Sequence, residues 1–305
     1  MVDVISALAP VFLLIAFGWG ARVRGLATAE QFGAVNRFGY FVLYPAFLFT
    51  LVSGADFSVG DSGEFVAAVL LGFLGVSAFG LLLFWPFRNN TPAFTSVFQG
   101  VARWNGFSLL AAAAALYGDV GTSMIGIVFG PLVFMVNIIC VIVLARWGSA
   151  RATSMRAVLD QIIANPLVLG CAAGLLAQAV GVRDFGPLSD ALRLLGQAAM
   201  PVALLCVGAG LDFKALRGSA AHIGAACFGR LLVAPAIVYG VALLMGLSPL
   251  STAVAVGVAA TPTAAAGYTL AHEMGGDARL MAAIITATTL FSAITMPLVI
   301  GLALH

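Results

Sequence analysis

The chain has 305 residues, of which 62% are hydrophobic and only 9% are charged, and its mean hydropathy is +1.10. A soluble domain has about 45–50% apolar and about 25% charged residues. This composition excludes an ordinary soluble protein, and the formal net charge of +2 is too small to indicate a nucleic-acid partner. The expected surroundings are membrane lipid.

The charges are separated by apolar stretches of roughly 20 residues, the length that crosses a bilayer as a helix. The first apolar stretch follows the acidic Asp3, and the basic residues Arg22 and Arg24 come after it. A cleaved signal peptide has its basic residues before the apolar stretch, so this stretch is not expected to be one. The sequence therefore predicts an all-α, polytopic membrane protein with no soluble domain. Ten spans are expected, at 4–22, 32–53, 64–86, 92–117, 121–146, 159–180, 189–211, 219–245, 249–273 and 278–303.

An internal repeat relates the two halves of the chain at an offset of 156. Over positions 10 to 57 this offset gives 12 identities in 48. The matches include Pro45 with Pro201, and Asp56 with Asp212. We interpret the chain as two five-span repeats, 1–147 and 159–305, joined by a connection at 148–158.

Five is an odd number of crossings, so the second repeat enters the membrane from the face opposite to the first. The sequence therefore predicts an inverted-topology repeat, which many secondary transporters have. Ten of the 14 Lys and Arg residues fall at the loops on one side and two at those on the other. The positive-inside rule then predicts a cytoplasmic (inner) membrane protein with both termini outside.

The fourth span of each repeat is the expected place of the binding site, because inverted-repeat carriers bind substrate near the midplane at broken helices. Asn105-Gly106 interrupts the span at 92–117, and Thr261-Pro262-Thr263 interrupts the span at 249–273. Thr261 followed by Pro262 has the form of a helix start, with Thr261 as the cap. A helix that unwinds near Ala260 and restarts at Pro262 would direct free N–H groups at an anion. The alternative is an ordinary proline kink.

Two arginines lie deep inside spans, where an ionisable residue indicates a functional site. Arg103 is expected either to hold a substrate carboxylate with its planar fork of donors or to bind backbone carbonyls freed by the broken helix. For Arg230 a structural role is favoured, because apolar residues and Pro235 follow it.

Three further polar residues are candidates. Asn137, in the span at 121–146, is expected to face the substrate or to make an interhelical hydrogen bond. Asp56 and Asp212 are candidate gates or proton-linked sites, or the polar ends of their spans. The cysteines lack metal-ligand spacing, so neither a metal nor a cofactor is expected.

Several motifs, in this order along the chain, resemble the auxin efflux carrier family, which includes bacterial permeases for small organic acids. The resemblance covers nearly the whole chain. Its motifs are Leu43-Tyr44-Pro45-Ala46, Arg103-Trp104-Asn105-Gly106, Ala164-Asn165-Pro166-Leu167, Leu195-Gly196-Gln197-Ala198-Ala199-Met200-Pro201, and Thr261-Pro262-Thr263 followed by Gly275-Gly276-Asp277.

The resemblance implies a fold like the bile-acid symporters and sodium/proton antiporters, in which a scaffold of spans 1, 2, 6 and 7 flanks a transport domain and the broken spans 4 and 9 cross. It implies a carboxylate bound near Asn105, Gly106, Asn137 and Thr261 to Thr263. Family members often have a proline at the span 4 crossover, and this chain has none there.

The leading hypothesis is thus a secondary transporter of a small organic anion, a mono- or dicarboxylate, with alternating access. Coupling to protons, coupling to sodium and uniport stay open, as does a homodimer. A cation/proton antiporter of the same fold is the alternative, although such carriers need mid-membrane carboxylates. A channel is a remote alternative, and so is an intramembrane enzyme, for which no nucleophile–base pair stands out.

Overall fold

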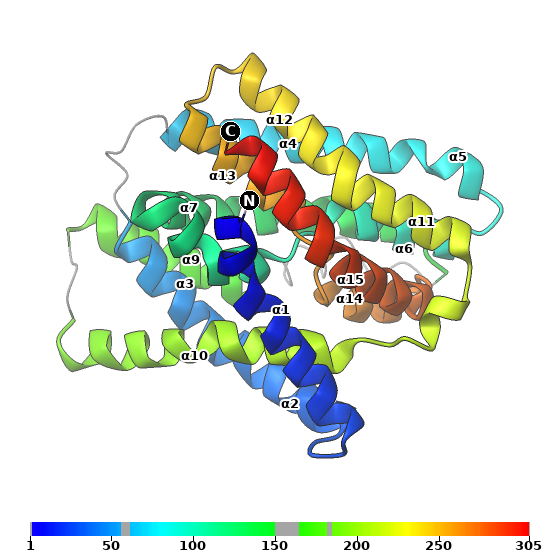
Figure 1. The fold of residues 1–305 in the computed structure, drawn as a ribbon, viewed down its shortest axis with the longest axis horizontal. Helices are drawn as coiled ribbons and strands as arrows, with labels where there is room; N and C mark the ends of the chain where they lie inside the picture. The colour runs from blue at the N-terminus through cyan, green and yellow to red at the C-terminus, as the bar shows by residue number, and fades with distance from the viewer. Residues whose placement is uncertain (1, 56–61, 150–164, 182–184, 305) are drawn as a thin grey trace.

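The computed structural model describes residues 2–55, 62–149, 165–181 and 185–304, so Asp56 and most of the 148–158 connection lie outside the described residues. The described chain is helical and contains no β-strand (Figure 1). Its helices are α1 (Val2–Val23), α2 (Ala29–Phe38), α3 (Tyr44–Ser53), α4 (Ser62–Leu82), α5 (Phe84–Phe87), α6 (Thr91–Ala102), α7 (Gly106–Trp147), α9 (Pro166–Ala179), α10 (Pro187–Gly210), α11 (Ala220–Phe228), α12 (Ala234–Leu244), α13 (Pro249–Ala260), α14 (Ala266–Met274) and α15 (Ala278–Ala303). The short turns are η1 (Gly39–Leu43) and η3 (Gly229–Val233), both π-helical, and η2 (Ala215–Arg217), which is 3₁₀.

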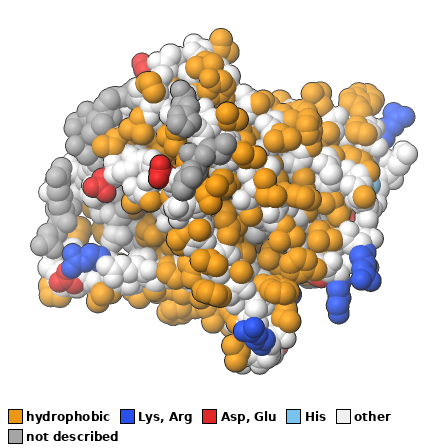
Figure 2. Space-filling view, viewed as in Figure 1, with side chains coloured by type: hydrophobic (Ala, Val, Ile, Leu, Met, Phe, Trp, Pro, Cys, Tyr) orange, Lys and Arg blue, Asp and Glu red, His pale blue; other side chains and the backbone are white. Residues whose placement is uncertain are grey.

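Seven helical stretches of the described residues are long and apolar enough to cross a membrane. Two shorter apolar helices, α9 and α13, accompany them. Apolar side chains cover the middle of one face, and the Lys and Arg side chains lie at its margins (Figure 2). Because lipid-facing surfaces are apolar and charges stay near the water, this distribution is that of a multi-pass membrane protein.

The helix boundaries follow local sequence signals. Asn90, Ser248 and Asp277 cap the starts of α6, α13 and α15 by accepting a backbone N–H in the first turn. The predicted spans 92–117 and 121–146 meet inside α7, at Gly118. This residue has φ 66° and ψ −168°, a conformation that costs glycine little because it lacks Cβ. The chain therefore changes direction where the two spans were expected to part.

The helices pack in two groups. The first, here called the panel, pairs α1 with α10 and α3 with α9, and also contains α2 and η1. The second, here called the bundle, contains α4 to α7 and α11 to α15. In the bundle α4 packs along α12 (Figure 1). α7 contacts both groups.

Hydrogen bonds near the helix ends hold the bundle together at one end. The hydroxyl of Ser96 donates to the carbonyl oxygen of Asp277 over 2.9 Å, and the Asp277 N–H donates to Pro92 over 3.2 Å. Ser149, just after α7, donates its N–H and its hydroxyl to the Gly275 carbonyl. The ends of α6, α7, α14 and α15 are thereby held together.

Candidate functional site at the crossing of two interrupted helices

The first interruption separates α6 from α7. Arg103 leaves helical geometry, with φ −80° and ψ 137°, and Asn105 has φ −101° and ψ 87° before α7 begins at Gly106. The interruption needs no proline. A Cβ on Gly106 would lie 2.3 Å from the Phe129 ring and 2.9 Å from the Trp104 ring. The glycine therefore lets the new helix start tightly against aromatic side chains.

The second interruption separates α13 from α14, and it is longer than the sequence predicts. α13 ends at Ala260, as expected, but α14 begins at Ala266 and not at Pro262. The hydroxyl of Thr261 does not cap the new helix, whose N-cap position is Ala265, and instead donates to the Val258 carbonyl of the preceding helix. The predicted restart was therefore wrong by four residues.

Contacts between the two interruptions explain this length. The Asn105 N–H donates to the Pro262 carbonyl over 3.0 Å, and the Thr263 hydroxyl donates to the Gly100 carbonyl over 2.6 Å. The Thr263 N–H donates to the Thr288 hydroxyl. Backbone groups that a helix would have satisfied are thus satisfied across the crossing. We refer to residues 103–105 and 261–265 together as the crossover.

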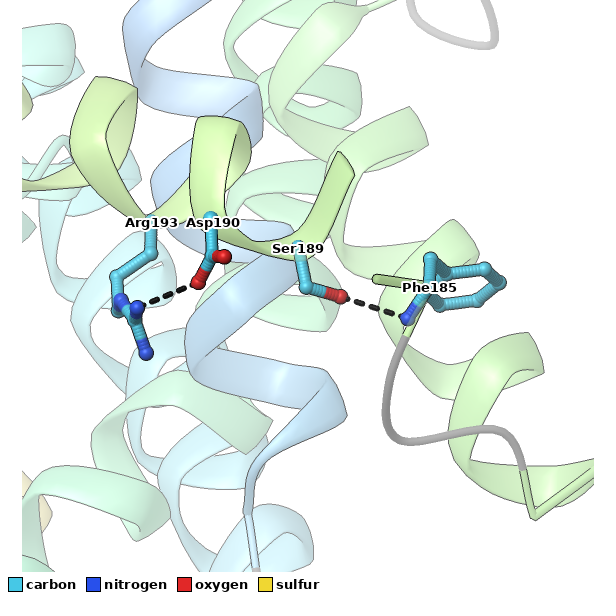
Figure 3. Close-up of polar contacts among 4 residues, drawn as sticks. All are labelled: Phe185, Ser189, Asp190 and Arg193. Atoms are coloured by element: carbon cyan, nitrogen blue, oxygen red, sulfur yellow. Dashed lines mark hydrogen bonds and ion pairs between the residues drawn. The ribbon is translucent and has the colours of Figure 1, made fainter. Parts of the chain in front are cut away.

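Arg103 is buried at the crossover without a carboxylate partner. Its side chain is 6% exposed, and its Nε donates to the Gln99 amide oxygen over 3.0 Å. It also interacts with the Cys140 thiol of α7. The only ion pair among the described residues joins Arg193 to Asp190, exposed on α10 (Figure 3). The positive charge of Arg103 is therefore uncompensated by any described acidic group.

Other polar groups beside the crossover also lack partners. The Gln99 Nε2, the Trp104 Nε1 and the Ser108 hydroxyl are buried and make no hydrogen bond to a described residue. The side chain of Asn105, which is 5% exposed, makes none either. An unpaired buried polar group costs about 1–3 kcal/mol. Such a concentration of donors is expected where a ligand with acceptor atoms binds.

Two helix starts add partial positive charge. α7 begins directly after Asn105 and α14 begins at Ala266, and neither start has a side-chain cap. Part of each first turn is already bonded, since the Gly267 and Tyr268 N–H groups donate to the Ala264 and Ala265 carbonyls and the Ser108 N–H donates to Asn105. The start of a helix nevertheless carries a partial positive charge. The local field of the crossover, from Arg103 and the two helix starts, favours an anion.

The panel closes one side of this region with aromatic side chains. Phe107, one residue into α7, packs on Tyr44 with ring centroids 4.7 Å apart and on Phe47 at 6.3 Å. Tyr40 of η1 is near enough to interact electrostatically with Arg103. The crossover therefore lies at the boundary between bundle and panel.

Asn137 lies on α7, one turn before Cys140. Residues three apart share a helix face, so Asn137 lies on the face that carries the Arg103 contact. Its side chain is partly exposed, and it makes no hydrogen bond to another described residue. The interhelical amide bond considered for Asn137 is thus not formed within the described chain.

Arg230 lies in η3 and contacts the crossover and the two helix ends beside it. It is 0% exposed. Its Nε donates to the Thr261 carbonyl over 3.0 Å, its Nη1 to the Val101 carbonyl over 3.0 Å, and its Nη2 to the Ala259 carbonyl. Arg230, and not Arg103, thus binds the backbone carbonyls at the ends of the interrupted helices.

Asp212 lies just after α10 and beside α15. Its carboxylate accepts the backbone N–H groups of Lys214 over 2.9 Å and Ala215 over 3.2 Å, and its own N–H donates to Thr286. Both side-chain bonds hold the η2 turn. The geometry is that of a turn cap.

Several residues of the site have no individual signal in the sequence. Gln99 precedes Arg103 by four residues, a spacing that places both on one helix face, so it could have been found. Tyr40 and Cys140 could not, because their proximity to Arg103 depends on how separate helices pack.

Comparison with known proteins agrees with a transporter. The chain is 26% identical over 307 residues to a protein named "Putative malonate transporter" from Rhizobium meliloti (strain 1021), covering 97% of this chain and 94% of that protein. It is 24% identical over 301 residues to an "Uncharacterized transporter" from Methanothermobacter thermautotrophicus, covering 94% of each. The family model described as membrane transport protein matches residues 3–300. The chain therefore belongs to the membrane transport protein family, the auxin efflux carrier family that its motifs resemble.

Proposed function

We propose that this protein is a secondary carrier of a small organic anion, a mono- or dicarboxylate, and that the anion binds at the crossover. The observation that carries the proposal is the buried Arg103, whose charge has no described carboxylate partner. A guanidinium can bind a carboxylate through two parallel N–H···O bonds. The substrate would supply the missing negative charge.

The surrounding groups fit the same ligand. The Asn105 side chain offers donors, and the uncapped starts of α7 and α14 add partial positive charge near Arg103. In broken-helix carriers, half-helix N-termini point at the anionic group of the substrate. The Thr261, Pro262 and Thr263 segment shapes the other wall, and Asn137 is the candidate for a polar contact from α7.

Symmetric packing supports the inverted repeat of 1–147 and 159–305. A Cβ on Gly18 of α1 would lie 2.0 Å from the Leu205 carbonyl oxygen of α10. One on Gly174 of α9 would lie 3.0 Å from the Phe49 carbonyl oxygen of α3. Gly174 is the repeat counterpart of Gly18, and Leu205 is that of Phe49, so the offset of 156 turns each contact into the other. Pseudo-symmetric halves of this kind give alternating access.

The panel is the proposed scaffold and the bundle the proposed moving domain. The crossover bond from Asn105 to Pro262 and the loop bonds of Ser96 and Ser149 hold the bundle together as one body. Movement of that body against the panel would carry the anion between the two sides. We place the protein in the cytoplasmic membrane with both termini outside, from its loop charges.

A cation/proton antiporter of the same fold fits the site less well. That activity needs a carboxylate buried at mid-membrane, and none of the described Asp or Glu residues is buried. The relative named for malonate supports testing dicarboxylates first.

Counterflow in proteoliposomes tests this function. Purified protein is reconstituted into vesicles that contain unlabelled malonate, succinate or lactate, and entry of the same acid in labelled form is followed. Vesicles that contain the neutral diamide of malonate are the control. We expect transient accumulation of a labelled carboxylate above equilibrium, driven by the same unlabelled acid inside and absent with the diamide. Entry without accumulation would indicate a channel. Absence of uptake for every acid, with folded protein, would contradict the proposal.

Asp212 gives a separate prediction, because its carboxylate caps η2. Asp212→Asn keeps an acceptor oxygen and is expected to retain the stability and the pH dependence of transport. Asp212→Ala is expected to lose about 1 kcal/mol of stability, the usual value of a lost cap. Thermal unfolding in detergent and counterflow across pH measure both. A pH profile flattened by Asp212→Asn would instead make this residue a proton carrier.

A further inference from the structure

Arg230 is a cation enclosed by the chain itself. It is fully buried, and a Phe73 ring centroid lies 5.3 Å from its Cζ. None of its hydrogen bonds goes to a carboxylate, and the described part of the chain pairs it with no acidic residue. All three donor nitrogens instead bind backbone carbonyl oxygens. A buried charge with this arrangement must be stabilised by those carbonyl dipoles.

The three carbonyls belong to the ends of both interrupted helices. Val101 is the penultimate residue of α6, and Ala259 and Thr261 flank Ala260, the last residue of α13. The last carbonyls of a helix have no intrahelical donor and carry a partial negative charge. Arg230 therefore places its charge where two negative helix ends meet, while the two positive helix starts face the region of Arg103.

Such carbonyls are also the ligands for a coupling cation in broken-helix carriers. There, unwound backbone carbonyls and half-helix C-terminal ends coordinate the sodium ion. In this chain the guanidinium of Arg230 already takes the carbonyls of both helix ends, and the Thr263 hydroxyl is bound to the Gly100 carbonyl. A sodium ion would have to displace a fixed positive charge to reach them.

We infer that Arg230 is a built-in counter-cation, which assembles the crossover in place of a bound sodium ion and makes carboxylate transport independent of sodium. The inference rests on the proposed function and deepens it, because it concerns the coupling of that same site. Arg230 acts as a positioning residue: it holds the two helix ends and touches no substrate.

Sodium dependence of the unaltered protein is the first test. The melting temperature in detergent is measured in sodium, potassium and choline chloride at equal ionic strength, and malonate counterflow is measured in the same three salts. We expect the same melting temperature and the same rate in all three. A saturable rise in melting temperature specific to sodium would show a ligand bound to the folded protein and would overturn the inference.

The two readouts separate the inference from the function on which it rests. Counterflow that requires sodium would support the proposed carrier function but contradict the role inferred for Arg230. If sodium does not change the melting temperature and no acid shows counterflow in any salt, the carrier function is contradicted. The inference that Arg230 takes the place of a bound sodium ion would still stand.

Substitutions at Arg230 distinguish charge from packing. Arg230→Lys keeps a positive charge and Arg230→Met keeps the volume without it, so we expect the Lys variant to melt higher and to transport at least about tenfold faster than the Met variant. A role in packing alone predicts the reverse order, and that result would overturn the inference. If neither variant folds, the sodium measurements on the unaltered protein still decide.

Arg22 provides the matched control. Its Nη2 donates to the Leu211 carbonyl, at the C-terminal end of α10, over 2.6 Å, but its side chain is only partly buried and makes no hydrogen bond to a described crossover residue. Arg22→Lys and Arg22→Met are therefore expected to transport equally well. A difference between them as large as that at Arg230 would mean that any arginine on a helix end behaves this way, and would contradict the specific role.

Discussion

Replacing Arg103 with glutamine is expected to abolish carboxylate transport, with a loss of at least about 100-fold in rate. Losing one partner of a buried, charged hydrogen-bonded pair costs about 2–5 kcal/mol, and each 1.4 kcal/mol is a factor of ten. Glutamine keeps a donor but loses the positive charge and the planar fork. Because Arg103 has no described acidic partner, its removal leaves no carboxylate unpaired, so folding is expected to survive.

The measurement is counterflow of labelled malonate, with malonate-induced thermal stabilisation in detergent as an independent readout of binding. Arg103→Lys serves as the control for charge and is expected to retain part of both signals, since lysine binds a carboxylate as a point charge. Malonate transport at the unaltered rate in Arg103→Gln would remove this residue from the site. Equal stabilisation of the unaltered protein by malonate and by its neutral diamide would count equally against an anion site.

Gly208→Ala is expected to destabilise the fold by about 3 kcal/mol or more, at the upper end of the usual cost of overpacking. The added Cβ would lie 1.8 Å from the Ile15 carbonyl oxygen, and a backbone atom cannot rotate away as a side chain can. α1 and α10 would have to separate. Since this contact belongs to the panel, the loss should appear in thermal unfolding before any change in substrate preference.

Gly20→Ala on α1 is the control for this prediction. A Cβ there meets no atom within 4 Å, and alanine is favoured over glycine in a helix by about 1 kcal/mol. We therefore expect Gly20→Ala to melt at or above the temperature of the unaltered protein. A Gly208→Ala variant that melts like Gly20→Ala would show that the panel helices are not in contact there.

Several helix boundaries could be predicted because they depend on local signals, whereas the ten-span arrangement stays a prediction. The apolar length of each stretch and caps such as Asn90, Ser248 and Asp277 are written in the sequence near the helix ends that they define. The two interruptions were also predictable, from Asn105-Gly106 and from Thr261-Pro262. For these features the local preference and the packed structure agree.

The features that the sequence does not predict depend on contacts between distant segments. α14 starts at Ala266 because the Pro262 carbonyl binds Asn105 and the Thr263 hydroxyl binds Gly100 near the end of α6, 157 and 163 residues away along the chain. Likewise, Arg230 finds its acceptors in Val101 and Thr261, 129 and 31 residues away. Local propensity carries no information about such partners, so the restart was misplaced and the ligands of Arg230 were not foreseen.

Access to position 105 from the two sides of the membrane tests the central claim most directly. Asn105→Cys would be introduced into a variant whose native Cys140, Cys171, Cys206 and Cys227 are replaced, and then labelled with a membrane-impermeant thiol reagent. If a carboxylate crosses at the crossover by alternating access, the cysteine is labelled from either side and the transported acid slows labelling from both. Labelling from one side only, or labelling that the acid does not change, would contradict the account.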